Sequence, residues 1–209
     1  MNPVEEAKLK KILPLNGPTI KEVKKYLKKY SGEYIVIKCG GSVLNNPELF
    51  KIFIQDISIL KKLNFKPCVI HGGGAKITSR LKESNIKSNF IKGLRITDAK
   101  TISIVEDVLV EFNKEIVKAF NDNSCKARSL TSKGHCIIID VKADNKELGF
   151  VGTPNKIKTE ILNQIIEADE IPVIAPLGLN TDNQVFNINA DTAAGAIAKK
   201  LKARRLLIV

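Results

Sequence analysis

Several residue types on which whole classes of protein depend are scarce in this chain of 209 residues. It has no tryptophan and only two histidines, so a zinc site is not expected and no metal ligand is assigned. No apolar run approaches the roughly 18 residues of a membrane-spanning helix. The opening stretch, MNPVEEAKLKK, lacks the apolar core of a signal peptide. We therefore expect a cytoplasmic protein with no membrane partner.

Cysteine is also sparse and lacks the spacing of metal sites and redox motifs. The four cysteines, at positions 39, 68, 125 and 136, form no CxxC pair, and three of them lie at the edges of apolar runs. Buried free thiols in a reducing compartment are the expected outcome.

The two commonest nucleotide-binding motifs are missing. The sequence contains neither a GxxxxGK[ST] loop nor a GxGxxG fingerprint. If the chain binds phosphate, the geometry therefore differs from that of P-loop and Rossmann proteins.

Positive charge, in contrast, is abundant. Lys and Arg total 34 against 22 for Asp and Glu, which gives a formal net charge of +12. The lysines occur singly and in pairs on expected helix surfaces, and no aromatic residues are interleaved with them as a stacking platform for bases would need. A nucleic-acid partner is therefore not expected. A small anionic substrate accounts for part of the excess and surface solubility for the rest.

Short apolar runs alternate with longer amphipathic segments along most of the chain. The runs predict strands at 34–38, 66–71, 171–176 and 204–209, and a hairpin over 127–144. Helical periodicity predicts helices within 18–30, 45–64, 74–84, 97–123, 155–168 and 189–202. Pro18 suits the first turn of the first of these helices, and Asn46 suits the N-cap of the second.

Continuous apolar strands that alternate with helices indicate an α/β protein. We expect a mostly parallel open sheet with helices on both faces, a three-layer sandwich. In such sheets, ligands bind beyond the carboxyl ends of the strands. This rule selects Lys38 to Ser42, His71 to Gly74 and the chain from Gly178 onward.

Two glycine clusters follow two of the predicted strands. IKCGGS contains Lys38 followed by Gly40 and Gly41, and HGGG ends in Gly73 and Gly74. Bare backbone can bring N–H groups close to an anion, and the N-terminus of a following helix adds partial positive charge. A tight strand-to-helix turn would also use glycine, but two clusters, one beside a lysine, indicate a phosphate site.

Two further motifs carry polar side chains. GLRITD offers Arg95, whose guanidinium fork suits a carboxylate; a surface pairing with Asp98 is the alternative. In NINADTAAG, Asn187, Asn189 and Asp191 alternate on an extended stretch, which would place all three side chains on one face. Helix capping by Asn189 or Asp191 is the alternative there.

In order and approximate spacing, several motifs resemble those of the acetylglutamate kinases, members of the amino acid kinase superfamily. The resemblance covers residues 34–209 and rests on IKCGGS, HGGG, GLRITD, VEDVLVEFNKEIV, GFVGTP, IPVIAPLG and NINADTAAGAIA. It implies phosphorylation of the side-chain carboxylate of N-acetyl-L-glutamate by ATP, the second step of arginine synthesis. It also implies that Mg2+ arrives on the phosphates of ATP.

The resemblance assigns a role to each candidate residue. Lys38 would neutralise charge on the moving phosphoryl group, and Asp191 would orient that lysine, which makes both catalytic candidates. The phosphate-binding candidates are Gly40, Gly41 and Gly73, and the substrate-binding candidates are Gly73, Gly74, Arg95, Asn187 and Asn189. Arg95 would grip the α-carboxylate. Because the acceptor carboxylate is already ionised at neutral pH, no general base is needed.

The resemblance also sets expectations for the two ends of the chain. The family continues beyond RRLLIV into an ATP-binding part with a second catalytic lysine, so we expect a chain truncated after its substrate-binding half, with weak binding and little turnover by itself. We expect an N-terminal helical extension over 1–30 and an acetylglutamate-binding domain over 31–209. The extension resembles the helix that joins dimers into hexamers in arginine-inhibited members. We therefore expect a homo-oligomer, dimeric or hexameric, with arginine as a candidate effector; a solvated tail is the alternative.

Three other functions are compatible with the sequence. An acetylaminoadipate kinase of lysine synthesis takes a substrate one methylene longer, and one methylene contributes only about 1 to 3 kcal/mol to discrimination. A non-catalytic ligand-binding subunit of the same fold would be favoured by loss of Lys38 or Asp191, yet both are present. A nucleic-acid binder driven by net charge would show steeply salt-dependent binding.

Overall fold

The computed structural model describes residues 3–133 and 138–209, and a five-stranded parallel sheet forms its centre. The strand order is β11-β1-β2-β8-β5. These strands are β1 (Tyr34–Cys39), β2 (Lys66–His71), β5 (Ala127–Leu130), β8 (Ile171–Ile174) and β11 (Arg205–Ile208). The expected α/β architecture with a mostly parallel sheet is confirmed.

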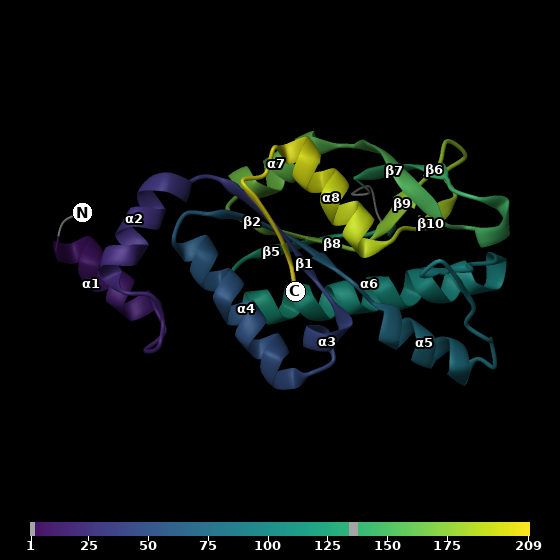
Figure 1. Ribbon diagram of the computed structural model, residues 1–209, viewed down its shortest axis with the longest axis horizontal. Helices are drawn as coiled ribbons and strands as arrows, with labels where there is room; N and C mark the ends of the chain where they lie inside the picture. The colour runs from purple at the N-terminus through teal and green to yellow at the C-terminus, as the bar shows by residue number, and fades with distance from the viewer. Residues whose placement is uncertain (1–2, 134–137) are drawn as a thin grey trace.

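Helices cover both faces of this sheet (Figure 1). One face packs against α4 (Pro47–Lys62) and α6 (Ala99–Asp122), and the other against α7 (Thr159–Glu167) and α8 (Ala190–Leu201). Successive side chains of a strand point to opposite faces, and β1 shows the consequence. Val36 belongs to the α7/α8 core, whereas Ile35 and Ile37 belong to the α4/α6 core. Burial on both faces explains why the strands are continuous apolar runs.

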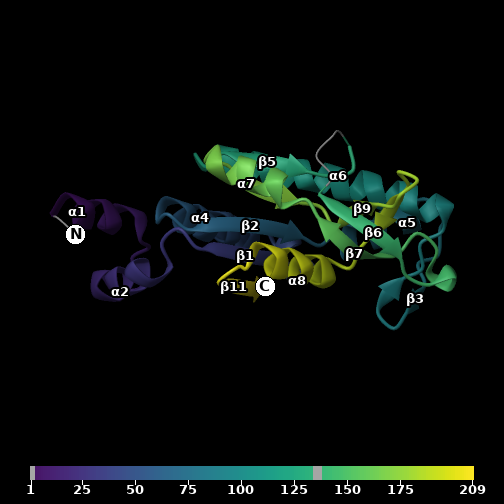
Figure 2. The ribbon, with the colours of Figure 1, turned by 90° about the horizontal axis from the view of Figure 1, so that it is seen from above.

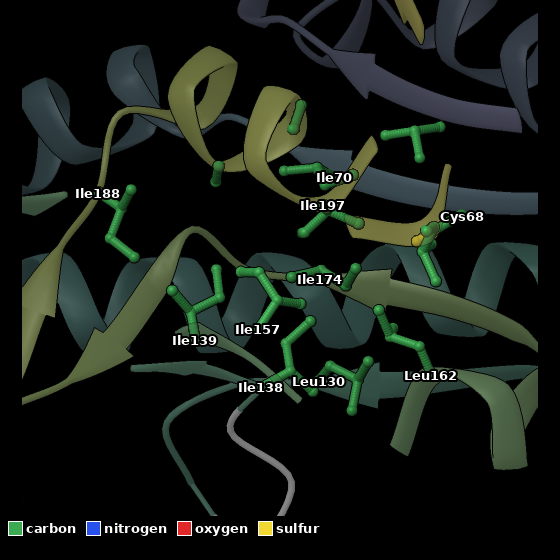
Figure 3. Packing of buried hydrophobic residues seen from close by; sticks show 14 of the residues in the cluster. Cys68, Ile70, Leu130, Ile138, Ile139, Ile157, Leu162, Ile174, Ile188 and Ile197 are labelled. Atoms are coloured by element: carbon green, nitrogen blue, oxygen red, sulfur yellow. The ribbon is translucent and has the colours of Figure 1, made fainter. Parts of the chain in front are cut away.

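The core on the α7/α8 side contains mainly aliphatic side chains (Figure 3). Ile70 and Ile174 from the sheet meet Ile197 from α8 and Leu162 from α7, all 1% exposed or less. Cys68 is fully buried in the same cluster, and Cys39 and Cys125 are buried on the opposite side. The expected burial of these three thiols is confirmed. His135 and Cys136 lie outside the described residues.

The helices begin where the sequence supplies side-chain caps. Asn46 accepts N–H bonds from two residues of the first turn of α4, and Asp98 accepts one from Thr101 at the start of α6. In α2 (Ile20–Tyr30), Thr19 is the N-cap and forms a capping box with Glu22. The placement of Pro18 in the first turn of that helix was therefore wrong, because Pro18 precedes the cap.

A second sheet, mostly antiparallel, was not predicted. Its strand order is β10-β9-β6-β7. The strands are β6 (Ile139–Ala143), β7 (Gly152–Ile157), β9 (Leu177–Leu179) and β10 (Val185–Asn187). β7 occupies part of the segment 155–168 that was predicted to be helical, and β7 contains Pro154. Because β7 is at the sheet edge, the N–H that proline lacks costs no hydrogen bond in the centre of the sheet.

The predicted hairpin over 127–144 was wrong. β5 pairs in parallel with β8, whereas β6 pairs antiparallel with β7 in the other sheet. Both segments do form strands, so the local propensity was correct. Long-range pairing with strands that lie later in the chain decided their partners.

Short elements complete the structure around the carboxyl edge of the central sheet. They are α3 (Gly41–Leu44), α5 (Gly74–Glu83), the strand pair β3 (Phe90–Ile91) and β4 (Leu94–Arg95), and the 3-10 turn η1 (Lys146–Leu148). α5 packs against α6 through a small apolar cluster that includes Ile77, Leu81 and Leu109.

Two N-terminal helices, α1 (Pro3–Ile12) and α2, project beyond the end of the sheet (Figure 2). An ion pair of 2.8 Å between Lys24 Nζ and Glu6 Oε2 joins them, and Leu9 and Val23 are buried. Within the described part of the chain, no helix has the length and apolar character needed to cross a bilayer.

Candidate functional site

The carboxyl ends of β1 and β2 open into a cavity of about 230 Å³. Segments from distant parts of the sequence converge there: the glycine turns after the two strands, β4, and the junction between β10 and α8. Every residue to which the resemblance assigned a role lines this cavity. These residues are Lys38, Gly40, Gly41, Gly73, Gly74, Arg95, Asn187, Asn189 and Asp191.

Lys38 and Asp191 form an ion pair in the cavity wall. Lys38 Nζ lies 2.9 Å from Asp191 Oδ1, and the two side chains are 15% and 57% exposed. β1 fixes Lys38 opposite Ile70 of β2, and the first turn of α8 presents Asp191. The carboxylate thus fixes the ammonium at one point of the cavity.

Cys39, next to Lys38, does not take part in chemistry at the site. Its side chain is fully buried on the α4/α6 side of the sheet, and burial raises the pKa of its thiol to about 12. The thiol therefore stays protonated at neutral pH and is not a nucleophile.

The two glycine clusters have packing roles in addition to any role in binding. A Cβ at Gly40 would lie 3.0 Å from the carbonyl oxygen of Val209 and 3.3 Å from Lys38 Nζ. A Cβ at Gly73 would lie 2.6 Å from Leu109 Cδ2, so the end of the Leu109 side chain occupies the space that a side chain at this position would need. Gly74 has open space around it. Part of the glycine signal in the sequence therefore comes from packing.

Arg95, at the end of β4, also lines the cavity. It is only 7% exposed, and its guanidinium donates to Gly74 O at 3.1 Å, to Thr78 Oγ1 at 3.0 Å and to Ser88 Oγ. The Phe90 ring lies 4.7 Å from its Cζ. Burial lowers the pKa of Arg95 from its usual value, yet guanidinium groups remain charged at neutral pH. The alternative of a surface arginine paired with Asp98 was wrong, because Arg95 is buried and its guanidinium bonds go to other residues, while Asp98 caps α6.

The asparagines and the aspartate of NINADTAAG are arranged differently from the expected extended face. Asn187 ends β10, Asn189 is the N-cap of α8, and Asp191 lies in the first helical turn. The prediction that the three side chains alternate along one extended stretch was therefore wrong, because the chain changes from strand to helix between Asn187 and Asp191. Asn189 Oδ1 accepts the N–H groups of Asp191 and Thr192, both at 3.0 Å. Asn189 is therefore both the predicted helix cap and a residue of the cavity wall.

The charge in the cavity favours an anion. Among its lining residues, two cations, Lys38 and Arg95, face one carboxylate, Asp191, which leaves one net positive charge. Within residues 3–133 and 138–209, no group of three or more His, Cys, Asp and Glu side chains is placed to hold a metal ion.

The sequence did not predict the residues that hydrogen-bond to the candidate site residues and position them. Thr78 and Ser88 are ordinary polar residues whose contact with Arg95 depends on the fold. His71 was selected only as part of the stretch after a strand and was given no role, and Asn113 was not singled out, yet the two side chains meet beneath the HGGG turn. No local pattern distinguishes a buried asparagine in a long amphipathic helix from a surface one.

Larger hollows lie elsewhere, two beside the N-terminal helices and one, of about 450 Å³, beside the C-terminal end of α5. One of about 460 Å³ is almost wholly apolar, and one of about 610 Å³ lies between α1, α2 and the end of α4. None of these hollows collects convergent polar groups from several strands at the carboxyl edge of the sheet. The smaller cavity is therefore the candidate site.

Comparison with known sequences identifies related proteins. Residues 33–209 match the model of the amino acid kinase family. A curated acetylglutamate kinase of Pelagibacter ubique (strain HTCC1062) is 62% identical over 209 residues, covering 100% of this chain and 72% of that protein. An acetylglutamate kinase of Caldanaerobacter subterraneus subsp. tengcongensis is 41% identical over 197 residues, covering 93% of this chain and 66% of that protein. The chain thus spans about two thirds to three quarters of the length of these relatives.

Solved structures share the fold at lower sequence identity. The smu.665 protein of Streptococcus mutans UA159 superposes with a TM-score of 0.77 at 26% identity, covering 84% of this chain and 71% of that one. N-acetylglutamate synthase of Neisseria gonorrhoeae, solved with coenzyme A and N-acetyl-glutamate, gives a TM-score of 0.78 at 22% identity, covering 90% of this chain and 44% of that one.

Proposed function

The chain belongs to the amino acid kinase family, and from this premise we propose that its cavity binds N-acetyl-L-glutamate as the acceptor of a phosphoryl group from ATP. The acceptor atom is an oxygen of the side-chain carboxylate, and the reaction is the second step of arginine synthesis. Curated relatives named acetylglutamate kinase, at 62% and 41% identity, support the choice of substrate.

The observation that carries the proposal is the placement of two fixed cations in one small cavity. The Lys38 ammonium, held by Asp191, and the buried Arg95 guanidinium both line it, with two glycine turns also in its wall. A substrate with two carboxylates can use both cations. We assign the α-carboxylate to Arg95 and place the reacting carboxylate near Lys38.

This arrangement suits phosphoryl transfer to a carboxylate. The acceptor is already ionised at neutral pH, so its nucleophilic oxygen needs no base. Catalysis then consists of holding two anions together and stabilising the charge that spreads over the transferred oxygens. Lys38 provides that charge, and Asp191 keeps the ammonium in place. Gly40, Gly41 and Gly73 contribute backbone N–H groups to the phosphoryl group, while Gly73, Gly74, Asn187 and Asn189 contact the substrate.

We propose that any Mg2+ binds on the phosphates of ATP. Asp191 is the one carboxylate among the lining residues, and it is paired with Lys38, so this part of the chain fits a metal carried by the nucleotide better than a protein cage. Bound there, Mg2+ would neutralise phosphate charge.

Several finer features of the function are also proposals. Lys38 is the one lysine that lines the cavity, which supports a substrate-binding role with little turnover by this chain alone. We place a helical extension over residues 1–30 before a substrate-binding domain over 31–209, and infer that the extension mediates homo-oligomer formation. The buried thiols of Cys39, Cys68 and Cys125 support a reducing compartment, the cytoplasm. Arginine inhibition stays a prediction.

Calorimetry with N-acetyl-L-glutamate tests the proposal. We expect saturable binding to the 209-residue chain, and we expect Arg95→Ala to weaken it by roughly 10- to 100-fold, because charge-assisted hydrogen bonds to a carboxylate are lost. Arg80→Ala is the matched control, because it removes the same charge. Arg80 lies on the nearby α5 and pairs with Glu111 on the surface.

Two results would count against the proposal. Binding that survives Arg95→Ala but not Arg80→Ala would move the site away from the cavity. Tighter binding of the acetylaminoadipate homologue than of acetylglutamate would reassign the substrate to the longer acid.

A further inference from the structure

A buried polar pair lies directly beneath the HGGG turn. His71, the last residue of β2, is fully buried, and so is Asn113 of α6. His71 Nε2 lies 3.1 Å from Asn113 Nδ2, and His71 Nδ1 lies 2.9 Å from the carbonyl oxygen of Gly72. Neither side chain lines the cavity.

The hydrogen-bond partners determine the tautomer of the imidazole. The Gly72 carbonyl can only accept, so Nδ1 must carry the proton and Nε2 must accept. Asn113 Nδ2 supplies one N–H to Nε2 and donates the other to the carbonyl oxygen of Val173, at 2.9 Å. A flipped amide would place Oδ1 against two acceptors. Burial lowers the pKa of His71 to about 4, and Lys76 acts in the same direction, so the imidazole is neutral at physiological pH.

The bond from Nδ1 restrains the peptide plane that joins Gly72 to Gly73. This peptide is trans, so its N–H points opposite to its C=O. With the Gly72 carbonyl turned toward the imidazole, the Gly73 N–H points away from the buried core. Gly72 N–H is bound to Cys39 O and Gly73 O accepts from Ile77 N, whereas no hydrogen bond among the described residues uses the Gly73 N–H.

A peptide between two glycines needs such a restraint. Glycine populates both signs of φ readily, so a Gly–Gly peptide can rotate at little cost, and rotation would turn the N–H inward. Asn113 Oδ1 is buried without a partner, an arrangement that costs stability. The His71–Asn113 pair is thus unfavourable as core packing, but it directly restrains the orientation of the Gly72–Gly73 peptide.

We propose that His71 and Asn113 are positioning residues that hold the Gly72–Gly73 peptide so that the Gly73 N–H faces the cavity as an anion donor. The identity of the anion rests on the proposed function. The orientation of the peptide does not.

Two substitutions at one position separate this role from simple packing. The amide nitrogen of asparagine can take the place of Nδ1, and that of glutamine the place of Nε2. His71→Asn therefore keeps a donor for the Gly72 carbonyl, and His71→Gln loses it. We expect His71→Gln to weaken N-acetyl-L-glutamate binding roughly 10-fold or more, and His71→Asn to recover most of that loss. Equal losses in the two variants, at equal folded fractions by circular dichroism, would overturn the proposal.

Nuclear magnetic resonance of the unsubstituted chain gives a test that needs neither a variant nor a functional ligand. The imidazole nitrogen shifts should show His71 protonated at Nδ1 and unprotonated at Nε2 at neutral pH. An Nε2–H tautomer or an imidazolium would overturn the proposal. If N-acetyl-L-glutamate fails to bind at all, the proposed function fails while the tautomer still decides the peptide restraint. If it binds, the Gly73 amide should shift during titration, and an unmoved Gly73 amide would count against the donor role.

Discussion

At the scale of single residues, Gly73 shows how packing and binding share one position. Its backbone lies in the wall of the cavity, while the space where a Cβ would be is occupied by Leu109 of α6. Its neighbour Gly74 has no atom within 4 Å of that position. Packing therefore restricts the side chain at Gly73 but not at Gly74, although both glycines belong to one motif.

We expect Gly73→Ala to lower the free energy of unfolding by about 1 to 2 kcal/mol, because the new methyl group overpacks against Leu109. Gly74→Ala is the matched control and should cause no loss, since an added methyl group there meets open space and alanine favours the helix. Urea unfolding of the two variants measures the difference. Combining Gly73→Ala with Leu109→Ala should show a favourable coupling, and additive losses would contradict the steric cause.

At the scale of elements, the starts of the long helices were predictable from single residues. Asn46 caps α4 as expected, and Asp98 likewise caps α6, because a cap is a local hydrogen bond between a side chain and the next turn. The junction between β10 and α8 was harder to predict. Asn189 is a cap and also a cavity residue, so sequence alone could not choose between its two roles.

A matched pair of caps separates these roles. Asn46 and Asn189 each accept two backbone N–H groups at 3.0 to 3.1 Å. We expect Asn46→Ala and Asn189→Ala to destabilise the protein similarly, by about 1 kcal/mol each in thermal unfolding. Only Asn189→Ala should also weaken N-acetyl-L-glutamate binding in calorimetry. Unchanged binding in that variant would leave Asn189 as a cap alone.

At the scale of the whole molecule, two surfaces can meet a second copy. The N-terminal helices project from the body (Figure 2). Leu15 is exposed and Tyr26 is half exposed. At one edge of the central sheet, β11 pairs only with β1 and exposes Leu207 and Ile208. Unpaired strand edges with apolar side chains favour association.

We expect the chain to form oligomers and removal of residues 1–29 to lower its mass in light scattering, because the deletion removes the projecting surface. Ile208→Lys tests the strand edge separately. Ile52→Lys is its control, since Ile52 lies on α4 with a similar exposure, 51% against 56%. An unchanged mass after the deletion would contradict a role for the N-terminal helices, and a loss confined to Ile208→Lys would assign the interface to β11.

The sequence by itself determined the central layer and the candidate residues of the site. Apolar runs long enough to be buried on both faces indicated a parallel sheet, and the carboxyl-end rule then selected Lys38 and the HGGG turn. These inferences succeed because strand burial and glycine turns are local properties that a short stretch of sequence records.

Only the tertiary structure decided which distant segments meet. The pairing of β5 with β8, the contact of Arg95 with Thr78 and the pairing of His71 with Asn113 join residues between 17 and 44 positions apart in the sequence. Such contacts depend on how layers pack, and a buried hydrogen bond leaves no periodic trace in either partner. The sequence therefore indicated which groups could bind an anion, and the packing of α6 beneath the sheet decided how the glycine turn presents its N–H group to it.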